Sequence, residues 1–150
     1  MGKVIGQPTS FAIGTAFNPL AEDMEKELGR LAKKRESGAD FLMTQPVFDI
    51  EALVTAAKLI PSDWNPPILV GVLPLRSARH AEFLHNEVPG MTIPDHIRAK
   101  LASVDAESAK KIGCQYARDI YLAARESFGG VYFMPPFNNY EVIREVMVGG

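Results

Sequence analysis

The sequence is poor in several features that would assign a protein to a class. It has one cysteine, Cys114, so no intrachain disulfide can form, and this usage fits a reducing compartment. No apolar run reaches the roughly 20 residues that a membrane-spanning helix needs. The formal net charge is only −2, which gives no indication of a nucleic-acid partner. Residues 1–8 lack the apolar segment of a signal peptide, so we expect a cytoplasmic protein with no membrane partner.

Short motifs that bind nucleotides or metal ions are missing as well. Residues 17–20 (FNPL), which follow the first predicted strand, lack the glycines of a dinucleotide-binding turn, and no P-loop occurs. The histidines His80, His85 and His96 show neither HxxxH nor HExxH spacing, and Cys114 is remote from them in sequence. We therefore expect neither an open dinucleotide-binding sheet nor a metal site.

What the chain does contain is four units of an apolar strand followed by a helix. The strands are predicted at residues 11–17, 40–45, 68–73 and 131–134. A residue that can cap a helix follows each strand, and another precedes a long helix. These residues are Asn18, Asp49, Ser77, Asp105 and Asn138. Apolar residues then recur at helical spacing in stretches that end near residues 38, 60, 87 and 128, and a further helix begins near Pro94.

Strands that alternate with helices imply right-handed βαβ units and a parallel sheet. A closed (β/α)8 barrel is favoured over an open sheet, but such a barrel needs about 250 residues and eight strands. We therefore interpret residues 1–150 as a single partial domain, an α/β half-barrel of four parallel strand–helix units. Its two unpaired edges predict either a missing N-terminal half or self-association of two copies.

In such barrels the functional residues lie at the C-terminal ends of the strands. This rule singles out residues 17–19, 44–49, 74–77 and 135–139. Within them, the amide of Gln45 can bind the edge of a heterocycle such as a pterin or a nicotinamide. A structural hydrogen bond to a loop is the alternative explanation of the same amide.

Other residues near the strand ends have two explanations each. Asp49 is better explained as a helix cap than as a catalytic carboxylate. His80, one turn into a helix, is a candidate ligand contact. The aromatic residues Phe17, Phe48 and Phe137 either line a flat ligand or pack in the core.

Four stretches of sequence carry a resemblance to a known family. They are residues 16–19 (AFNP), 38–49 (GADFLMTQPVFD), 71–90 (GVLPLRSARHAEFLHNEVPG) and 135–141 (PPFNNYE). In this order and register they resemble methylenetetrahydrofolate reductase. Residues 81–90 (AEFLHNEVPG) are most similar to the bifunctional form, in which the reductase follows a homocysteine S-methyltransferase domain.

The resemblance implies a (β/α)8 barrel with FAD at its C-terminal face, to which this chain supplies strands five to eight. The implied reaction is two hydride transfers. NAD(P)H reduces the flavin and leaves, and the reduced flavin passes hydride to 5,10-methylenetetrahydrofolate, giving 5-methyltetrahydrofolate. The family's glutamate general acid and its aspartate near the flavin lie on the first and fourth strands. We therefore expect no catalytic residue in this half and no turnover by the isolated chain.

Three positions are implied to bind the cofactor. Phe17 matches an aromatic residue beside the flavin, Lys34 a basic residue of the FAD-binding helix, and Glu27 a usually polar position on the same helix. Lys34 also has a simpler explanation, because it lies in a basic run, residues 33–35, at the end of a predicted helix, where cations interact favourably with the helix dipole.

Four positions are implied to bind the folate. Gln45 matches the glutamine that contacts folate and nicotinamide in the family. His80 occupies a folate-contacting amide position, and Leu84 lies near the place where an aromatic residue often packs on the folate. The fourth position, Asn139, departs from the family pattern.

Many members have an arginine at the position of Asn139, thought to bind folate. Asparagine can form hydrogen bonds but cannot neutralise the glutamate tail of a folate. The departure predicts either weaker folate binding or a substitution of this role by Arg76 or Arg79.

Two further functions remain open on the sequence. A free-standing half-barrel can act as an assembly or ligand-binding module without catalysis. An unrelated barrel enzyme that binds phosphate is the other, although the last two strand ends lack a glycine-rich loop.

Overall fold

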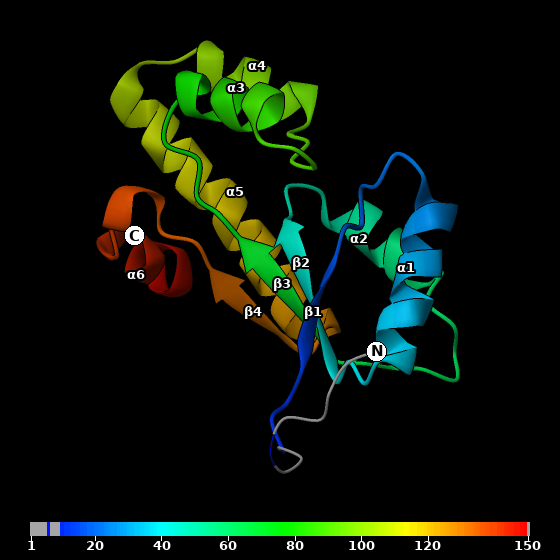
Figure 1. The fold of residues 1–150 in the computed structure, drawn as a ribbon. Helices are drawn as coiled ribbons and strands as arrows, with labels where there is room; N and C mark the ends of the chain where they lie inside the picture. The colour runs from blue at the N-terminus through cyan, green and yellow to red at the C-terminus, as the bar shows by residue number, and fades with distance from the viewer. Residues whose placement is uncertain (1–5, 7–9, 150) are drawn as a thin grey trace.

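The structure is a computed structural model that describes residue 6 and residues 10–149, so most of the stretch considered as a signal peptide lies outside it. One sheet contains four parallel strands in the order β1 (Gly14–Phe17), β2 (Phe41–Pro46), β3 (Ile68–Val72) and β4 (Gly130–Phe133). The helices are α1 (Met24–Glu36), α2 (Ile50–Ala57), α3 (Ala78–Glu87), α4 (Asp95–Ala102), α5 (Ala106–Ser127), the short 3₁₀ helix η1 (Pro136–Asn138) and α6 (Glu141–Val148) (Figure 1). Among the helices of this described part, none is long and apolar enough to cross a membrane.

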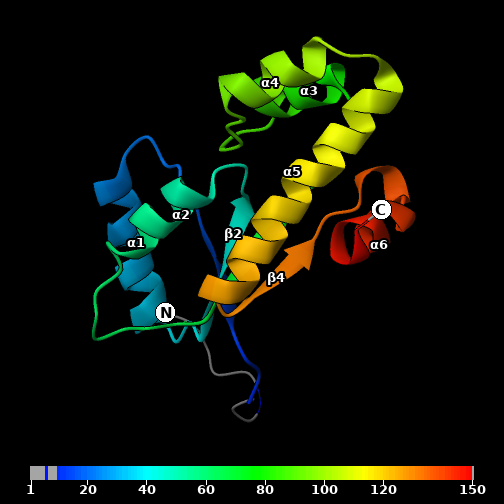
Figure 2. The same cartoon turned by 180° about the vertical axis from the view of Figure 1, so that it is seen from behind.

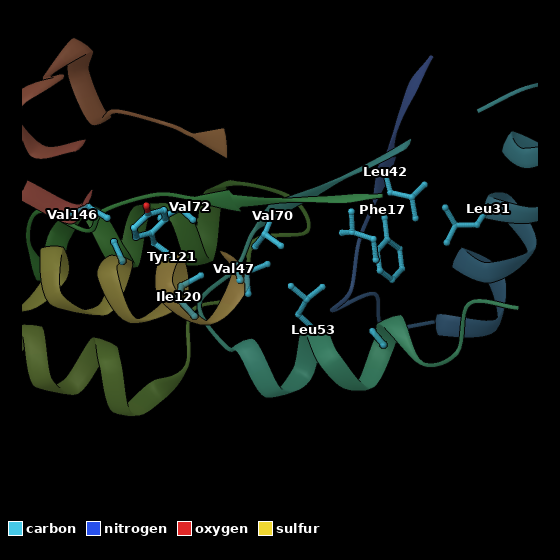
Figure 3. Packing of buried hydrophobic residues seen from close by; sticks show 14 residues of the cluster. Phe17, Leu31, Leu42, Val47, Leu53, Val70, Val72, Ile120, Tyr121 and Val146 are labelled. Carbon is cyan, nitrogen blue, oxygen red and sulfur yellow. The ribbon is translucent and has the colours of Figure 1, made fainter. Parts of the chain in front are cut away.

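The helices cover one face of the sheet and leave the other open. Figure 2 shows α1, α2 and α5 on the same side, and the main core is packed between them and the strands (Figure 3). Leu42, Val70 and Val72 point into this core and are buried. Because side chains alternate along a strand, the opposite side, called here the open face, carries Phe41, Met43, Gln45, Leu69, Gly71 and Tyr132.

A second layer, formed by α3 and α4, lies beyond the C-terminal ends of the strands (Figure 1). Ala81 and Leu84 of α3 share a buried cluster with Ile97 and Leu101 of α4. The first turn of α5 joins this cluster through Ala109, while the later turns of the same helix lie in the main core. Helix α5 therefore connects the sheet to the α3–α4 layer.

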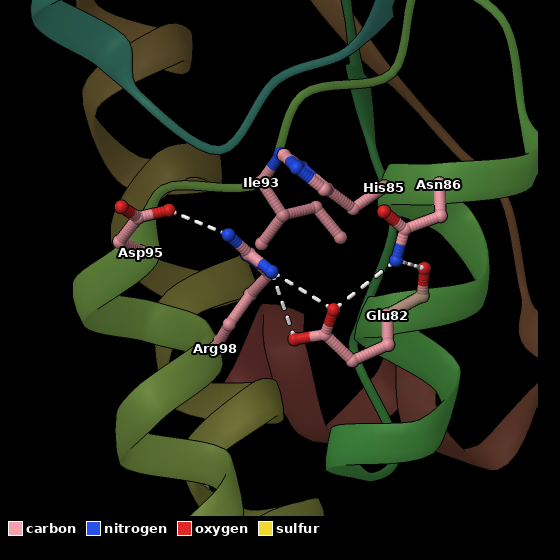
Figure 4. Close-up of polar contacts among 6 residues, drawn as sticks. All are labelled: Glu82, His85, Asn86, Ile93, Asp95 and Arg98. Atoms are coloured by element: carbon pink, nitrogen blue, oxygen red, sulfur yellow. Dashed lines mark hydrogen bonds and ion pairs between the residues drawn. The ribbon is translucent and has the colours of Figure 1, made fainter.

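One arginine links α3 to α4 (Figure 4). Nη1 of Arg98 donates to both carboxylate oxygens of Glu82, at 3.0 and 2.8 Å, and Nη2 donates to Asp95 at 2.6 Å. In the same region the backbone N–H of Ile93 donates to Nδ1 of His85 at 3.2 Å. The pair with Glu82 joins α3 to α4, whereas Asp95 lies on α4 itself and holds the guanidinium in place.

Three predicted helix caps are confirmed. The Asp49 carboxylate accepts two backbone N–H groups of the first turn of α2, both at 3.0 Å. Ser77 Oγ accepts the N–H of His80 at 3.1 Å, and Asp105 caps α5 in the same way. These interactions span two or three residues, which is why the sequence reveals them.

Two predicted caps are wrong. Helix α1 is capped by Asp23, because Asn18 is engaged in a turn in which its side chain accepts the N–H of Leu20 at 3.0 Å. Asn138 adopts a left-handed conformation with φ 58°, which is not the extended conformation of a cap. Helix α6 is preceded instead by Tyr140, without a side-chain capping hydrogen bond.

Two predicted boundaries also differ from the structure. The first strand begins at Gly14, not at residue 11, because β2 starts at Phe41 directly opposite; residues 11–13 are exposed. Helix α2 ends at Ala57, not at Ile60, because the N–H groups of Leu59 and Ile60 bond to carbonyl groups three residues earlier and tighten the chain into turns.

Helix α5 passes very close to the loop after β3 at Gly113. A Cβ atom at this position would overlap the backbone carbonyl group of Leu75, so only glycine allows the approach. The other helical glycine, Gly29 in α1, is exposed, and a Cβ atom there would meet nothing within 4 Å. The two glycines therefore form a natural pair of test and control positions.

Replacing Gly113 by alanine should lower the free energy of unfolding by about 1–3 kcal/mol, because α5 must move away from the loop to make room. Gly29→Ala should raise it by about 1 kcal/mol, since alanine favours an exposed helix interior over glycine. Urea unfolding followed by circular dichroism measures both changes. A stabilising effect of Gly113→Ala would contradict the close approach of helix and loop.

Candidate functional site

Gln45 lies on the open face at the C-terminal end of β2. It is half-buried, and its amide forms no hydrogen bond within the part of the chain that the structure describes. The pairing of β2 with β3 is irregular between Met43 and Pro46, where Thr44 Oγ1 accepts the N–H of Gly71 at 3.0 Å. Irregular pairing of this kind is common beside active sites, where it redirects a side chain. The amide of Gln45 is therefore available to a ligand.

Tyr132 is a residue of this region that sequence reasoning missed. Its hydroxyl donates to the carbonyl oxygen of Thr44, so the side chain crosses β3 on the open face. Gly71 makes room for it, because a Cβ atom there would lie 2.9 Å from the tyrosine hydroxyl oxygen. Burial raises the pKa of Tyr132 above the usual value of a phenol. A tyrosine in register with a strand glycine is the signal that could have revealed it.

Arg76, His80 and Phe137 come together where the loops after β3 and β4 meet. The rings of His80 and Phe137 are 5.9 Å apart, and the Arg76 guanidinium lies 5.4 Å from the centre of the Phe137 ring. Nδ1 of His80 accepts the backbone N–H of Arg76 at 3.3 Å. Burial, and then the charge of Arg76, lower the pKa of His80. His80 is therefore neutral near pH 7 and keeps Nε2–H as a hydrogen-bond donor.

The loop after β4 holds Phe137 in a strained conformation. Phe137 has φ 55° and Asn138 has φ 58°, a region that costs a non-glycine residue roughly 1–2 kcal/mol. Strain of this kind tends to occur at ligand-binding sites. The Phe137 ring is 80% exposed, whereas Phe17 and Phe48 are buried in the core. Of the three aromatic residues predicted near this end of the sheet, Phe137 is the one that presents a free surface.

A pocket of about 470 Å³ lies at the N-terminal ends of α3 and α5. It is lined by Arg76, Ser77, Arg79, His80, Phe83, Ala106, Lys110 and Phe137. Among the residues implied to bind folate, His80 lines this pocket. Leu84 is 7% exposed in the α3–α4 cluster, and Asn139 lines a separate depression of about 970 Å³ between α5 and α6.

The three residues implied to bind the cofactor all lie in the β1–α1 unit, apart from that pocket. Phe17 is fully buried in the main core. Glu27 is also buried, and its carboxylate accepts the N–H of Asn18 at 3.1 Å. Nζ of Lys34 donates to the carbonyl oxygen of Ala16 at 2.7 Å. Each side chain thus has a structural role here, and these residues do not by themselves form a flavin cradle.

The hydrogen bond of Lys34 covers the free edge of β1. The carbonyl of Ile13 accepts the N–H of Asp40 and so faces β2. Backbone groups alternate in direction along a strand, so the Ala16 carbonyl points the other way, to the unpaired edge. Lysine is one of the residues that protect edge strands against further pairing. Lys34 therefore satisfies the carbonyl that an additional strand would use.

The described residues contain no group of three or more histidine, cysteine, aspartate or glutamate side chains that could hold a metal ion. Cys114 is half-buried, and burial, followed by the charge of Glu145, raises the pKa of its thiol. A protonated thiol is a poor nucleophile.

The family model and the curated relatives that match this sequence belong to the same family. A family model described as methylenetetrahydrofolate reductase matches residues 7–147. Methylenetetrahydrofolate reductase 2 of Saccharomyces cerevisiae is 28% identical over 113 residues, which cover 69% of this chain and 18% of that protein. Methylenetetrahydrofolate reductase 2 of Schizosaccharomyces pombe is 26% identical over 137 residues, which cover 80% and 21%. The chain thus spans about a fifth of the length of these curated relatives.

A solved structure shares the fold. It is an uncharacterized protein from Clostridium thermocellum that binds two copies of 5-methyl-5,6,7,8-tetrahydrofolic acid, and it matches with a TM-score of 0.63 at 17% identity. The match covers 91% of this chain and 51% of that one. At this identity it shows the fold alone, and with the four parallel strands it confirms the expected half of a (β/α)8 barrel. Because the family model extends over most of the sequence, the chain belongs to the methylenetetrahydrofolate reductase family.

Proposed function

We propose that this chain is the C-terminal, folate-binding half of a flavin-dependent methylenetetrahydrofolate reductase. The proposed reaction carries hydride from NAD(P)H through FAD to 5,10-methylenetetrahydrofolate and yields 5-methyltetrahydrofolate. The observation that carries the proposal is the group of Arg76, His80 and Phe137 at the C-terminal ends of β3 and β4. Gln45 lies at the same end of the sheet, its amide forms no hydrogen bond to another described residue, and family membership supports folate as the ligand.

The chemistry of these side chains suits the parts of a folate. A pterin edge presents donors and acceptors, which the amide of Gln45 can match. The exposed ring of Phe137 offers a flat surface for stacking, and neutral His80 offers an N–H donor. Arg76 supplies a positive charge beside both rings, where a carboxylate can be paired.

The flavin, in this proposal, is held only when the rest of the barrel is present. FAD would supply the redox chemistry, while protein groups position it. Phe17, Glu27 and Lys34 would then shape one wall of its site from the β1–α1 unit. We assign no hydride step to a residue of this chain and propose that the isolated half is inactive.

Two finer expectations stay predictions. They are a cytoplasmic location and a greater similarity to the bifunctional form of the family than to its other members. The second rests on the sequence of residues 81–90 alone.

An assembly function for the half-barrel is the second candidate, and the free edge of β4 favours it. Phe133, Pro135, Tyr140, Ile143, Arg144, Met147 and Val148 line a mostly apolar pocket of about 490 Å³ beside this edge. Tyr140 and Val148 are 68% and 72% exposed. The solved chain with the same fold is about twice as long, so one further half would complete it. For the isolated chain we propose that a second copy covers this surface.

Gln45→Leu should weaken binding of 5-methyltetrahydrofolate by about tenfold, because the pterin edge then loses a hydrogen-bonding partner. Isothermal titration calorimetry of the 150-residue chain measures the effect. Asn65→Leu, which removes an exposed amide in the segment before β3, is the control and should bind as the wild type does. Unchanged affinity in Gln45→Leu, or no folate binding by the well-folded wild type, would count against the proposal.

FAD added to the isolated chain should show no saturable fluorescence quenching, because Phe17 is buried and Lys34 is bonded to Ala16. A fluorescence titration tests this. Saturable quenching that is lost in Lys34→Ala and kept in Lys33→Ala would contradict the expectation. That result would mean that this half holds the cofactor without the missing strands.

In sedimentation velocity at micromolar concentration, the wild type should form a dimer that Met147→Lys shifts towards monomer, since a charge then enters the apolar surface beside β4. Leu59→Lys is the control, because Leu59 is as exposed as Met147, at 50% against 49%, but lies after α2. Wild-type monomer over this range, or an equal effect of both lysines, would exclude this interface.

A further inference from the structure

The ladder between β2 and β3 contains one extra residue on the β2 side. Thr44 and Gln45 together lie opposite a single residue of β3, Val70, and the shift of register falls between Met43 and Pro46. An arrangement of two residues against one is a β-bulge, which bends the strand and redirects a side chain. We refer to Thr44 and Gln45 as the β2 bulge.

Pro46 explains why the ladder shifts at this point. In a regular parallel ladder, every second residue of a strand donates its N–H to the same neighbour. Leu42 donates to the carbonyl oxygen of Pro67 at 2.9 Å, so the donors of β2 facing β3 fall on alternate positions that include position 46. Proline has no N–H to donate. Val47 donates to the Gly71 carbonyl oxygen instead, at 3.0 Å.

The shift also changes the partners of Thr44. Had the regular register continued, the N–H of Gly71 would donate to the Thr44 carbonyl. The side chain of Thr44 takes this bond, because Oγ1 accepts the Gly71 N–H at 3.0 Å. The Thr44 carbonyl accepts the hydroxyl of Tyr132 from β4. The tyrosine thus supplies a donor to a carbonyl group that has left the regular ladder.

Tyr132 reaches the β2 bulge by passing over Gly71. A Cβ atom at Gly71 would lie 2.9 Å from the Tyr132 hydroxyl oxygen and 3.2 Å from the carbonyl oxygen of Gln45. The tyrosine side chain and the backbone of the bulge therefore come together above one residue of β3. This junction joins β2, β3 and β4 at a single point.

The backbone of the bulge decides where the Gln45 side chain points. The amide at the end of this side chain forms no hydrogen bond to another described residue, so no polar contact within that part of the chain holds it. The direction in which it leaves the strand is set by the conformation at Thr44 and Gln45. A hydrogen bond that fixes the Thr44 carbonyl therefore also limits the orientations of the Gln45 amide.

We propose that Tyr132 is a positioning residue, whose hydroxyl holds the β2 bulge through the Thr44 carbonyl and so orients the Gln45 amide towards the ligand. The proposal rests on the folate-binding function proposed above. Tyr132 itself makes no contact with the folate in this arrangement. Phenylalanine at this position keeps the ring over Gly71 and removes only the donor to Thr44.

The orientation of Gln45 can be measured without a ligand. Vicinal coupling constants about its Cα–Cβ bond, recorded by NMR on the whole chain, should indicate one rotamer in the wild type and rotamer averaging in Tyr132→Phe. Tyr121→Phe is the matched control. It removes a buried hydroxyl that also has one hydrogen bond, from Arg125 Nη1 at 3.3 Å, on the covered side of the sheet. It should leave the Gln45 couplings unchanged.

A double-mutant cycle tests whether the hydroxyl acts through Gln45. In calorimetric titration with 5-methyltetrahydrofolate, Tyr132→Phe should weaken binding about fivefold, because the amide is no longer held in its binding orientation. Tyr121→Phe should bind as the wild type does. The double variant Gln45→Leu, Tyr132→Phe should bind no more weakly than Gln45→Leu alone, since the group that the hydroxyl orients is then missing.

Four results would overturn the inference and leave the proposed function standing. They are unchanged couplings in Tyr132→Phe, equal averaging in Tyr121→Phe, full affinity of Tyr132→Phe, and a further loss of affinity in the double variant. The last result would mean that Tyr132 contacts the ligand itself. If the well-folded wild type binds no folate, the inference and the proposed function both fail.

Discussion

The contact between α5 and the loop after β3 is the constraint on which the rest of the structure depends. At Gly113 the helix lies against the Leu75 carbonyl so closely that no side chain fits. This approach lets one 22-residue helix contribute to both buried clusters, the core beneath the sheet and the α3–α4 layer. The same helix begins at the pocket beside His80 and Phe137, to whose lining it contributes Ala106 and Lys110. Packing of the fold and placement of the pocket therefore have one physical origin.

The residues implied to bind ligands fall into two groups that differ in burial and in the contacts they make. Around β3 and β4, the loops bring Arg76, His80 and Phe137 into contact, and Phe137 holds a strained conformation that keeps its ring in solvent. In the β1–α1 unit, Phe17 is part of the core and Lys34 covers the free strand edge. An exposed surface that can bind a ligand thus lies on the β3–β4 side of the sheet, and a protected strand edge lies on the β1 side.

Much of the fold could be predicted from the sequence, and rather less of the site. The strand–helix alternation and the caps Asp49, Ser77 and Asp105 were visible because they depend on residues within a few positions of each other. Asn18 looks like a cap by the same rule, yet its backbone N–H is bonded to Glu27 in the next helix and its side chain closes a turn. A local rule could not rank these competing partners.

The sequence by itself determined four parallel strand–helix units, their order, and the end of the sheet at which ligand contacts belong, because periodicity and the direction of parallel strands decide these. Only the tertiary structure decided which side chains meet there. Tyr132 reaches Thr44 across a strand, and Lys34 reaches Ala16 from the far end of a helix. Such contacts depend on how closely the helices and strands pack. A Cβ atom added at Gly71, for example, would collide with the Tyr132 side chain that crosses over it.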